Sequence, residues 1–474
     1  MAGISDEQVE DLKHELSGAK GIKVAGIDCD GILRGKVMQP SKFFSALKND
    51  GFGFCSVTFG WDMHDKTYDG VSSISNTENG FTDITAKVDV DSKRLLPWDD
   101  QQPFFLLTFH DISGSPIPPC PRSLLAAQAD KAKDMGFKCM AGLELEFFNF
   151  HEDPASLGSK AGRGLTHLTP GNFGYSMLRP MAKHTRDYFK EIYEQAIELE
   201  CPIEGWHTET GPGVYEAALA FDEVTRMADN GTLFKFLCKS LGLKHGITPC
   251  FMAKPVAGMS GNSGHIHMSL ADPDGTNLFA RNSTDEASPY PDVKDFSDIG
   301  RYFTAGVLEG LPDIMPLLAP NINSYKRLVE NYWAPVDVSW GLEHRLASVR
   351  LIAPPTCAPK ATRIEIRVPG ADIVPHYAMA ALLGLGLRGI EKKLAFSMPP
   401  LGHTPEPGTP AKSSIRLAKD LKEATVKFMA PGSLAREVLG DAFVEHFGFT
   451  RQQEIKQWEM TVTDWEVSRY METV

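Results

Sequence analysis

The chain has 474 residues, of which 42% are hydrophobic and 23% are charged. This composition is that of a globular protein with a sizeable core, and the length favours two domains, one of them large. A net charge of −13 at pH 7 excludes the basic surface that a general nucleic-acid binder needs. An anionic substrate remains compatible with this charge, because a local group of arginines is sufficient to bind it.

Eight cysteines are scattered along the sequence without a C-x-x-C pair. This spacing predicts neither a disulfide framework nor a structural zinc site, and it fits a reducing compartment. The N-terminus is polar and acidic, so we expect no signal peptide. The longest uniformly apolar run, AMAALLGLGL, has 10 residues, whereas a membrane-spanning helix needs about 18. We therefore expect a cytoplasmic protein.

The N-terminal region predicts a short helix followed by a small sheet. Residues 5–17 have an amphipathic pattern, and residues 21–38 alternate around a central turn as a hairpin does. Strand-like stretches follow at 53–59 and 103–111. The Pro-rich stretch SGSPIPPCPR, residues 113–122, is the best candidate for a domain boundary. The sequence thus predicts a β-rich N-terminal domain over residues 18–115.

Helical and strand patterns are mixed in the rest of the chain. Residues 122–136 and 185–200 have helical periodicity, whereas 137–150 predicts a strand. The stretch 271–298 is rich in Asp, Asn, Pro and Ser and predicts a loop, and the last 70 residues predict helices. The whole pattern predicts an α+β fold.

Three predicted strands each carry one apolar face and one face of ligand-type side chains. Side chains on a strand point to opposite faces in turn, and such alternation is also usual for a half-solvated antiparallel sheet. A face made only of carboxylates, or only of imidazoles and a hydroxyl, differs from the usual mixture and favours a functional site. The polar positions are Glu144 and Glu146 in GLELEFF, His265, His267 and Ser269 in GHIHMSL, and Arg363, Glu365 and Arg367 in TRIEIRV.

A fourth segment, WHTETGPGVYEAAL, adds Glu209 and Glu216 around a Gly-Pro-Gly turn. Carboxylates brought together repel one another and stay ionised only with a cation among them. Mainly oxygen donors with one histidine suit Mg²⁺ or Mn²⁺ better than zinc. Metal ions and several arginines around one cavity are the requirements of phosphoryl transfer. The arginines, suited to bidentate binding of phosphate or carboxylate, are Arg327, Arg345, Arg350, Arg363 and Arg367.

One dinucleotide-type motif is present in the wrong context. GLGLRG, residues 384–389, matches G-x-G-x-x-G but lies inside an apolar stretch that predicts a helix, whereas a dinucleotide site needs strand, turn and then helix. Close helix packing is the preferred interpretation of these glycines. The sequence has no G-x-x-x-x-G-K-[ST] motif, so we expect no ATP binding through a P-loop.

These motifs together resemble the glutamine synthetase family over nearly the whole chain. GLELEF, TETGPGVYE, FMAKP followed by GHIHMSL, N-x-x-S-Y-K-R, APVDVSWG and RIEIR occur in that family's order and at about its spacings. The resemblance implies an N-terminal β-grasp domain, residues 18–115, and a large catalytic domain with an antiparallel sheet and helices, residues 116–474. It also implies a homo-oligomer of two stacked pentamers or hexamers, with active sites between neighbouring subunits.

The resemblance also implies roles for the polar residues. Arg327 and Arg367 would bind the carboxylates of glutamate, with Gly261 lining the substrate. The implied cofactors are ATP and Mg²⁺ or Mn²⁺. One metal ion would be held by Glu146, Glu209 and Glu216, and a second, beside the ATP phosphates, by Glu144, His265 and Glu365. The nucleotide would be contacted by His267, Ser269, Arg345, Arg350 and Arg363.

The resemblance is weaker where the amine would bind. The segment YDGVSS makes Asp69 the candidate ammonium-site residue offered across the subunit interface, with Asp65 as the second choice. Ammonia-using family members carry a glutamate just before Ala-Pro in the flap over the substrate. This chain has Trp333 there, and Glu330 lies three residues earlier. We assign catalytic roles to Asp69, Arg345 and Glu330, and place Trp333 in the substrate site.

Trp333 favours an organic amine over ammonia as the acceptor. An indole in place of a carboxylate removes negative charge and adds apolar surface with a cation–π face. A polyamine, a monoalkylamine or ethanolamine would fit such a site. In the alternative, Trp333 only packs the flap, and Glu330 or Asp69 supplies the missing function.

The expected activity is ATP-dependent joining of glutamate to an amine. Phosphoryl transfer turns the poorly electrophilic γ-carboxylate into an acyl phosphate, which the amine then displaces. Metals and arginines stabilise the transferring group, and the site must exclude water. The alternatives are an ordinary glutamine synthetase, a ligase for another acid, and a non-catalytic ring-forming homologue. The complete ligand set argues against the structural homologue, and the presence of Arg327 and Arg367 argues against another acid.

Overall fold

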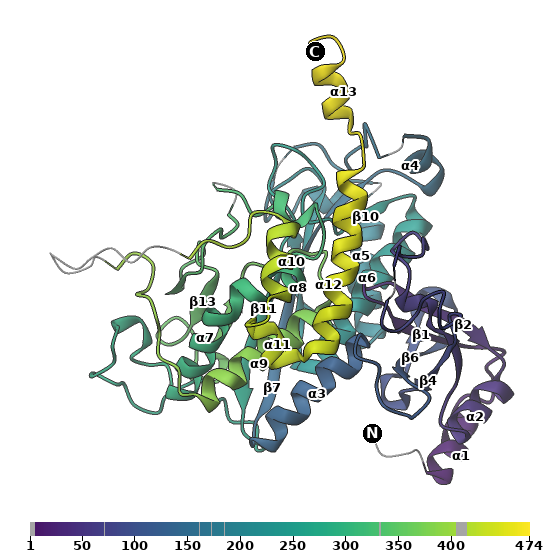
Figure 1. The fold of residues 1–474 in the computed structure, drawn as a ribbon, viewed down its shortest axis with the longest axis horizontal. Helices are drawn as coiled ribbons and strands as arrows, with labels where there is room; N and C mark the ends of the chain where they lie inside the picture. The colour runs from purple at the N-terminus through teal and green to yellow at the C-terminus, as the bar shows by residue number, and fades with distance from the viewer. Residues whose placement is uncertain are drawn as a thin grey trace.

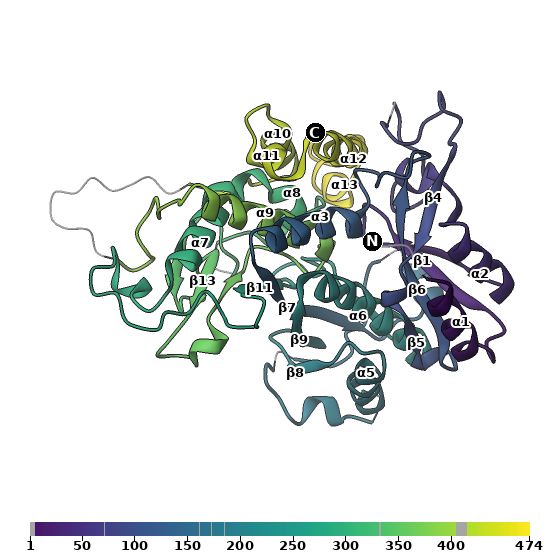
Figure 2. The same ribbon diagram turned by 90° about the horizontal axis from the view of Figure 1, so that it is seen from below.

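The computed structural model describes residues 5–70, 72–160, 162–171, 173–183, 185–330, 333–403 and 415–474. The chain forms two sheets, and most of the helices pack around the second one (Figures 1 and 2). The predicted α+β fold class is therefore confirmed in its general form. The β-grasp name for the first sheet and the boundary between residues 115 and 116 stay predictions.

The first sheet occupies the N-terminal region, drawn in purple and blue on the right of Figure 1. Its strands run in the order β2-β1-β6-β4-β3, with β5 paired to β6. The predicted hairpin is present as an antiparallel pair, and β1 also pairs with β6 in parallel. The elements are α1 (Asp6–Glu15), β1 (Ile22–Ile27), β2 (Leu33–Met38), α2 (Pro40–Lys48), β3 (Phe52–Cys55), β4 (Asp83–Val88), β5 (Arg94–Leu96) and β6 (Gln102–His110).

The strand-like stretch at 53–59 is only partly a strand. Pairing with β4 ends at Cys55, which lies opposite Asp83. The chain continues as a 3₁₀ turn, Ser56–Phe59, whose Phe59 side chain is fully buried. Apolar residues of this stretch therefore belong to the hydrophobic core although the strand ends before them.

The second sheet carries the strands with ligand-type faces. Its order is β12-β13-β14-β11-β7-β9-β8, with β10 paired to β7. All pairs are antiparallel except β12 with β13. The strands are β7 (Lys138–Phe150), β8 (Ile203–Thr208), β9 (Val214–Glu223), β10 (Thr248–Cys250), β11 (Gly264–Ala271), β12 (Trp340–Leu342), β13 (Val349–Ile352) and β14 (Arg363–Ile366).

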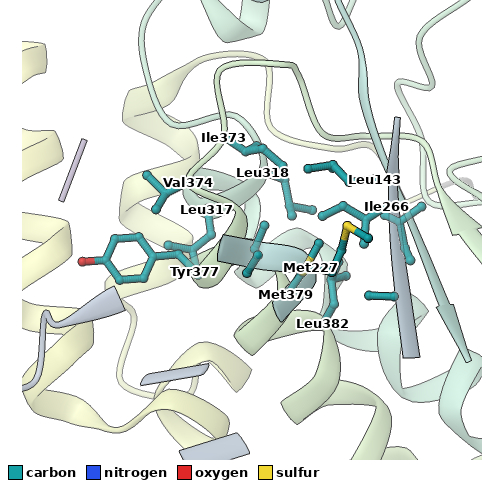
Figure 3. Close-up of a cluster of buried hydrophobic side chains, with 14 of the residues drawn as sticks. Leu143, Met227, Ile266, Leu317, Leu318, Ile373, Val374, Tyr377, Met379 and Leu382 are labelled. Atoms are coloured by element: carbon teal, nitrogen blue, oxygen red, sulfur yellow. The ribbon is translucent and has the colours of Figure 1, made fainter. Parts of the chain in front are cut away.

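Helices cover the apolar face of the second sheet. Leu143 of β7 and Ile266 of β11 are buried against Met227, Met379 and neighbouring helical side chains (Figure 3). Burial of such side chains contributes about 1.5–3 kcal/mol each. The helices are α3 (Pro121–Asp134), α4 (Pro154–Lys160), α5 (Arg186–Glu198), α6 (Val224–His245), α7 (Asp298–Gly310), α8 (Met315–Leu318), α9 (Pro375–Glu391), α10 (Leu421–Met429), α11 (Leu434–Leu439), α12 (Asp441–Glu459) and α13 (Asp464–Tyr470).

The helices predicted from periodicity are present. The stretches 122–136 and 185–200 correspond to α3 and α5, and the C-terminal region is helical from Leu421 onward. Part of that region, residues 404–414, lies outside the described residues. At the end of the chain, α13 projects away from the body of the molecule (Figure 1). None of the helices in the described ranges combines the length and apolar character needed to span a membrane.

The GLGLRG stretch lies within α9 and serves helix packing, as predicted. A Cβ atom on Gly389 would lie 2.1 Å from the carbonyl oxygen of Tyr302 and 2.9 Å from the Cα of Gly306, both on α7. Backbone atoms cannot move aside as the end of a flexible side chain can. Only glycine therefore allows α7 and α9 to cross this closely.

We expect Gly389→Ala to destabilise the fold by about 1–3 kcal/mol, because the added methyl group forces α7 and α9 apart. Chemical denaturation measures this effect. The control is Gly158→Ala in α4, where an added Cβ meets no atom within 4 Å; it should be neutral or stabilising by up to about 1 kcal/mol. Equal effects at the two glycines would contradict the packing role.

Candidate functional site

The register of the second sheet places ligand-type side chains in adjacent rows. His207 of β8 lies opposite Glu216 of β9, and Glu216 lies opposite Glu146 of β7. Two residues further along β7, Glu144 lies opposite His265 of β11. Directly opposite residues of antiparallel strands project to the same face, so the two rows meet at β7.

One cluster joins Glu144, His265 and Glu365, whose donor atoms all lie within 4.8 Å of one another. His265 Nδ1 lies 3.3 Å from Glu144 Oε2 and 3.4 Å from Glu365 Oε1. Burial alone would raise the pKa of Glu144, but hydrogen bonding with His265 and His267 brings it well below the usual range. This is the trio that the family resemblance assigned to the second metal ion.

A second cluster joins His207, Glu209 and Glu216, again with donor atoms within 4.8 Å. The two ring nitrogens of His207 each lie 3.9 Å from a carboxylate oxygen, one of Glu209 and one of Glu216. Glu146, predicted as the third ligand here, accepts a hydrogen bond of 2.8 Å from the backbone N–H of Ser263. Its metal role stays a prediction, and His207 is a further candidate.

The second cluster has the electrostatics of a cation site. Burial, followed by repulsion from Glu146, Glu144 and Glu209, raises the pKa of Glu216 to about 9. A divalent cation among these carboxylates would reverse the repulsion. The donors are carboxylates and imidazoles, a set that fits Mg²⁺ or Mn²⁺. The residues present therefore fit the divalent metal that the resemblance implies.

Arginines flank the first cluster. Arg350 of β13 lies opposite Glu365 and contacts it through Nη1 at 2.9 Å, and Arg367 also forms an ion pair with Glu365. Arg363 donates from Nε to His267 Nδ1 at 3.1 Å. Three of the five predicted arginines thus touch the ligand-type side chains directly.

Arg327 is buried close to this group, with only 4% of its surface exposed. It donates to the carbonyl oxygens of Val368 and Arg367 at 2.9 and 3.3 Å. Burial lowers its pKa to about 10, so it stays protonated at neutral pH. Its hydrogen bonds within the described residues go to these backbone oxygens, while the charges of Glu146 and Asp372 partly offset the effect of burial on its pKa. A buried guanidinium whose donors are not taken up by carboxylates is suited to an anionic ligand.

Gly261 packs directly on Arg327. A Cβ atom at this position would lie 2.9 Å from Arg327 Cγ and 2.2 Å from the carbonyl oxygen of Ala253. Any larger residue would displace the arginine or the backbone. This close approach explains why a glycine is needed at position 261, in addition to its predicted place in the substrate site.

A pocket of about 530 Å³ opens beside the first cluster. Its lining includes Glu144 and three residues predicted to lie near the nucleotide: His267, Ser269 and Arg363. Arg345 and Arg350 are not part of this lining. Sequence reasoning missed Phe221 and Lys360, which also line the pocket. Phe221 is 69% exposed near the end of β9, and its place in the pocket is recognisable only from the tertiary structure.

Tyr175 was also missed. Its ring stacks on that of His207, with centroids 4.3 Å apart and an angle of 23° between the planes. Its backbone has φ of +53° and donates to the carbonyl oxygen of Thr208 at 2.7 Å. The ring is 70% exposed, so an aromatic surface faces solvent beside the second cluster. Tyr175 lies in a loop, where periodicity carries no signal.

The predicted amine-site residues contact other parts of the chain. Asp69 is bonded to Lys456 of α12 at 3.1 Å, and Asp65 to Arg34 at 2.6 Å. Glu330 forms an exposed ion pair with Arg416 at 3.2 Å. Within one chain these carboxylates are therefore paired with basic side chains that belong to neither cluster, and their roles stay predictions.

Arg345 and Trp333 are both exposed. Trp333 has 67% of its surface accessible and a φ of +61°, a conformation that is rare for a bulky residue. Just after it, Val336 and Val338 pair with Leu417 and Ile415 through backbone hydrogen bonds of 2.9 and 2.8 Å. The indole therefore projects from a segment that is anchored on its C-terminal side.

Comparison with known proteins shows the family to which this chain belongs. Residues 118–470 match the family model described as glutamine synthetase, catalytic domain. That match spans well over half of the sequence, and the chain therefore belongs to the glutamine synthetase family of ligases. The family uses ATP and divalent metals, and it includes γ-glutamyl amine ligases.

Two curated relatives align over nearly the full chain. The chain is 40% identical to Type-1 glutamine synthetase 2 of Dictyostelium discoideum, over 97% of this chain and 85% of that protein. It is 34% identical to glutamate–isopropylamine ligase of a Pseudomonas species, over 96% and 95%. A solved structure of GmaS without ligand superposes with a TM-score of 0.79, at 24% identity and 99% coverage of both chains. That structure supports the fold alone.

We expect Glu216→Gln to remove a pH dependence from the metal-free protein. At pH values between the usual pKa of a glutamate and about 9, Glu216 holds a proton in the folded chain that it has lost in the unfolded chain. Stability in a chelator therefore falls as pH rises, by up to about 1.4 kcal/mol per pH unit. The substitution should abolish this slope and also reduce the rise in Tm that Mn²⁺ produces.

The matched control is Asp222→Asn, at the exposed end of the same strand, with a side chain 39% accessible. It should leave both the pH slope and the Mn²⁺ effect unchanged. An undiminished Mn²⁺ effect on Tm in Glu216→Gln would contradict the assignment of the second cluster as a metal site.

Proposed function

We propose that this chain uses ATP to phosphorylate the γ-carboxylate of glutamate and joins the product to an amine, with an organic amine favoured over ammonia. The observation that carries this proposal is the presence of two metal-type clusters together with Arg327, a buried guanidinium that bonds to backbone oxygens rather than to carboxylates within the described residues. Glutamate supplies carboxylates to Arg327, and ATP supplies phosphates to the arginines beside Glu365. A ligase of another acid would not need the same carboxylate site.

The first chemical step is transfer of the γ-phosphoryl group of ATP. An oxygen of the glutamate γ-carboxylate attacks phosphorus, and the bond between that phosphorus and the ADP oxygen breaks. Arg345, Arg350 and Arg363 are proposed to hold the phosphates, while Arg327 and Arg367 hold the acid. Bound divalent metals would neutralise the developing charge on the phosphoryl oxygens. The proposed metal ligands are Glu144, His265 and Glu365 in one site and Glu146, Glu209 and Glu216 in the other, with His207 added.

The second step is attack of the amine on the acyl phosphate. The amine nitrogen bonds to the carbonyl carbon, the carbon–oxygen bond to phosphate breaks, and the nitrogen loses one proton. We propose Asp69 or Glu330 as the carboxylate that receives this proton. Asp69 would act from a neighbouring subunit of a ring-shaped homo-oligomer, because within its own chain it is paired with Lys456.

Preference for an organic amine is supported by two exposed aromatic rings. Trp333 stands where ammonia-using family members carry a glutamate, and most of its indole contacts no part of the described chain. Tyr175 presents a second ring beside Glu209 and Glu216. Aromatic faces bind organic ammonium groups, and they provide apolar surface that ammonia cannot use. The Pseudomonas relative is named for isopropylamine, an acceptor of this class.

Ammonia remains the second candidate acceptor. The Dictyostelium relative, the more similar of the two at 40% identity, is named a glutamine synthetase. The two candidates differ only in the final nucleophile, since glutamate activation is common to both. The amine preference is therefore a separate question from the ligase activity.

The direct test compares amines with the purified protein. Phosphate release from ATP is measured with glutamate and Mg²⁺, in parallel with ammonium, methylamine, isopropylamine, ethanolamine, putrescine and spermidine. We expect one organic amine to give kcat/KM at least about tenfold above that of ammonium. Stronger stimulation by ammonium would make the protein an ordinary glutamine synthetase, and no stimulation by any amine would contradict the ligase proposal.

Trp333→Glu tests the role of the indole. The substitution restores a carboxylate at this position, so we expect the ratio of kcat/KM for the organic amine to that for ammonium to fall about tenfold or more. Ile112→Glu, which places a carboxylate at a loop position 95% exposed, serves as the control and should leave the ratio unchanged. An unaltered ratio in Trp333→Glu would assign the indole to packing alone.

A further inference from the structure

Three segments that are distant in the sequence meet at Arg451 on α12. Its Nη1 donates to the carbonyl oxygen of Pro320 at 2.7 Å, and its Nη2 donates to Asp30 Oδ1 at 2.6 Å. One turn further along α12, the Glu454 carboxylate accepts the backbone N–H of Ile322 at 2.9 Å. The helix therefore bonds both to the β1–β2 turn of the first sheet and to the chain that leads into Arg327.

The chain from Pro320 to Arg327 has little regular structure of its own. It contains only the short 3₁₀ turn Ser324–Lys326. On one side, Asn321 and Ser324 donate to Asp372 Oδ2 at 2.8 and 2.6 Å. Arg451 and Glu454 bond to its backbone from the other side. Its shape thus depends on side chains that reach it from elsewhere in the fold.

The Arg451–Asp30 pair is buried on both sides, whereas other polar contacts between α12 and the first-sheet region are partly buried (Ser73 with His446, Asp62 with Gln457) or exposed (Asp69 with Lys456). The two side chains are 3% and 7% exposed. The ion pair of Lys456 with Asp69, by contrast, has side chains 52% and 71% exposed. Removing one partner of a buried pair leaves an uncompensated charge and strongly favours rearrangement, while an exposed pair contributes little. Of the contacts that α12 makes with the first-sheet region, the Arg451–Asp30 pair is therefore the one whose loss should matter most.

We propose that Arg451 is a positioning residue that ties the β1–β2 turn to the substrate arginine, so that docking of the first sheet sets the affinity for the acid substrate. The inference rests on the proposed function, in which Arg327 binds a carboxylate of glutamate. Arg451 holds Pro320 in place, and Asp30 holds the orientation of Arg451. Loss of Asp30 then loosens the chain ahead of Arg327 without touching the nucleotide pocket.

The test substitutes Asp30→Asn and compares it with Asp62→Asn. Asp62 also joins the first-sheet region to α12, through Gln457 at 3.1 Å, but among the described residues Gln457 forms no hydrogen bond with residues 320–327. Two quantities are measured in the full-length enzyme: the KM values for glutamate and for ATP, and amide hydrogen exchange in the peptide covering residues 320–328. The amine is the best acceptor found in the comparison above.

Asp30→Asn should raise the KM for glutamate about fivefold or more and leave the KM for ATP within about twofold. Exchange in residues 320–328 should become faster, and Asp62→Asn should change neither quantity. Unchanged exchange and KM in Asp30→Asn would overturn the inference, as would equal increases for glutamate and ATP. If Asp30→Asn does not fold, Glu454→Gln is measured instead, with the same expected and contradicting results.

Failure of the proposed function can be distinguished from failure of the inference about Arg451. A wild-type enzyme that releases no phosphate in response to glutamate would refute that function. In that case the exchange comparison alone decides whether Arg451 positions residues 320–327.

Discussion

The site depends on one electrostatic constraint: the register of an antiparallel sheet forces carboxylates together at the centre of one face. Glu144 and Glu146 project from β7, and the pairing strands add Glu216 and His207 on one side and His265 on the other. Burial, followed by repulsion from the neighbouring carboxylates, raises the pKa of Glu216 to about 9, so the bare protein keeps a proton on it at neutral pH. Such a face is stable in the ionised state only with cations among the carboxylates, and cations are what a phosphoryl-transfer site requires.

The surrounding structure follows from this arrangement. The opposite face of the same strands is apolar and is buried beneath helices, so core packing adds to the backbone hydrogen bonds that fix the register. Arg350 and Arg367 pair with Glu365, so positive side chains stand next to the carboxylate of the first cluster. Arg327 stands apart with backbone carbonyls as its partners. In the proposed function, the arginines beside Glu365 bind phosphates and Arg327 binds a carboxylate.

The sequence was sufficient to locate the strands that build this face, because each alternates strictly and each polar position carries a ligand-type residue. It also indicated the role of Gly389, since its motif lay in a helical context. Residues whose place in the site depends on tertiary contacts could not be predicted from the sequence in the same way. Tyr175 lies in a loop and is placed by stacking on His207, and Phe221 is recognisable only once the pocket beside it is known. His207 could have been predicted as a metal ligand, because it alternates with Glu209 on the same predicted strand segment. In that segment, however, only the carboxylates Glu209 and Glu216 were selected as ligands. The strand expected at 53–59 was too long because pairing, which no local pattern reveals, ends at Cys55.

The central claim is that the γ-carboxylate of glutamate attacks ATP and forms an acyl phosphate, which the amine then attacks. Glutamate labelled with ¹⁸O in the γ-carboxylate tests this most directly, since the oxygen that attacks phosphorus leaves with the phosphate. The account predicts that each phosphate released during amide formation carries one labelled oxygen, as mass spectrometry would show. Phosphate without label, released while the amide accumulates, would contradict an acyl phosphate and with it the roles given to the clusters and to Arg327.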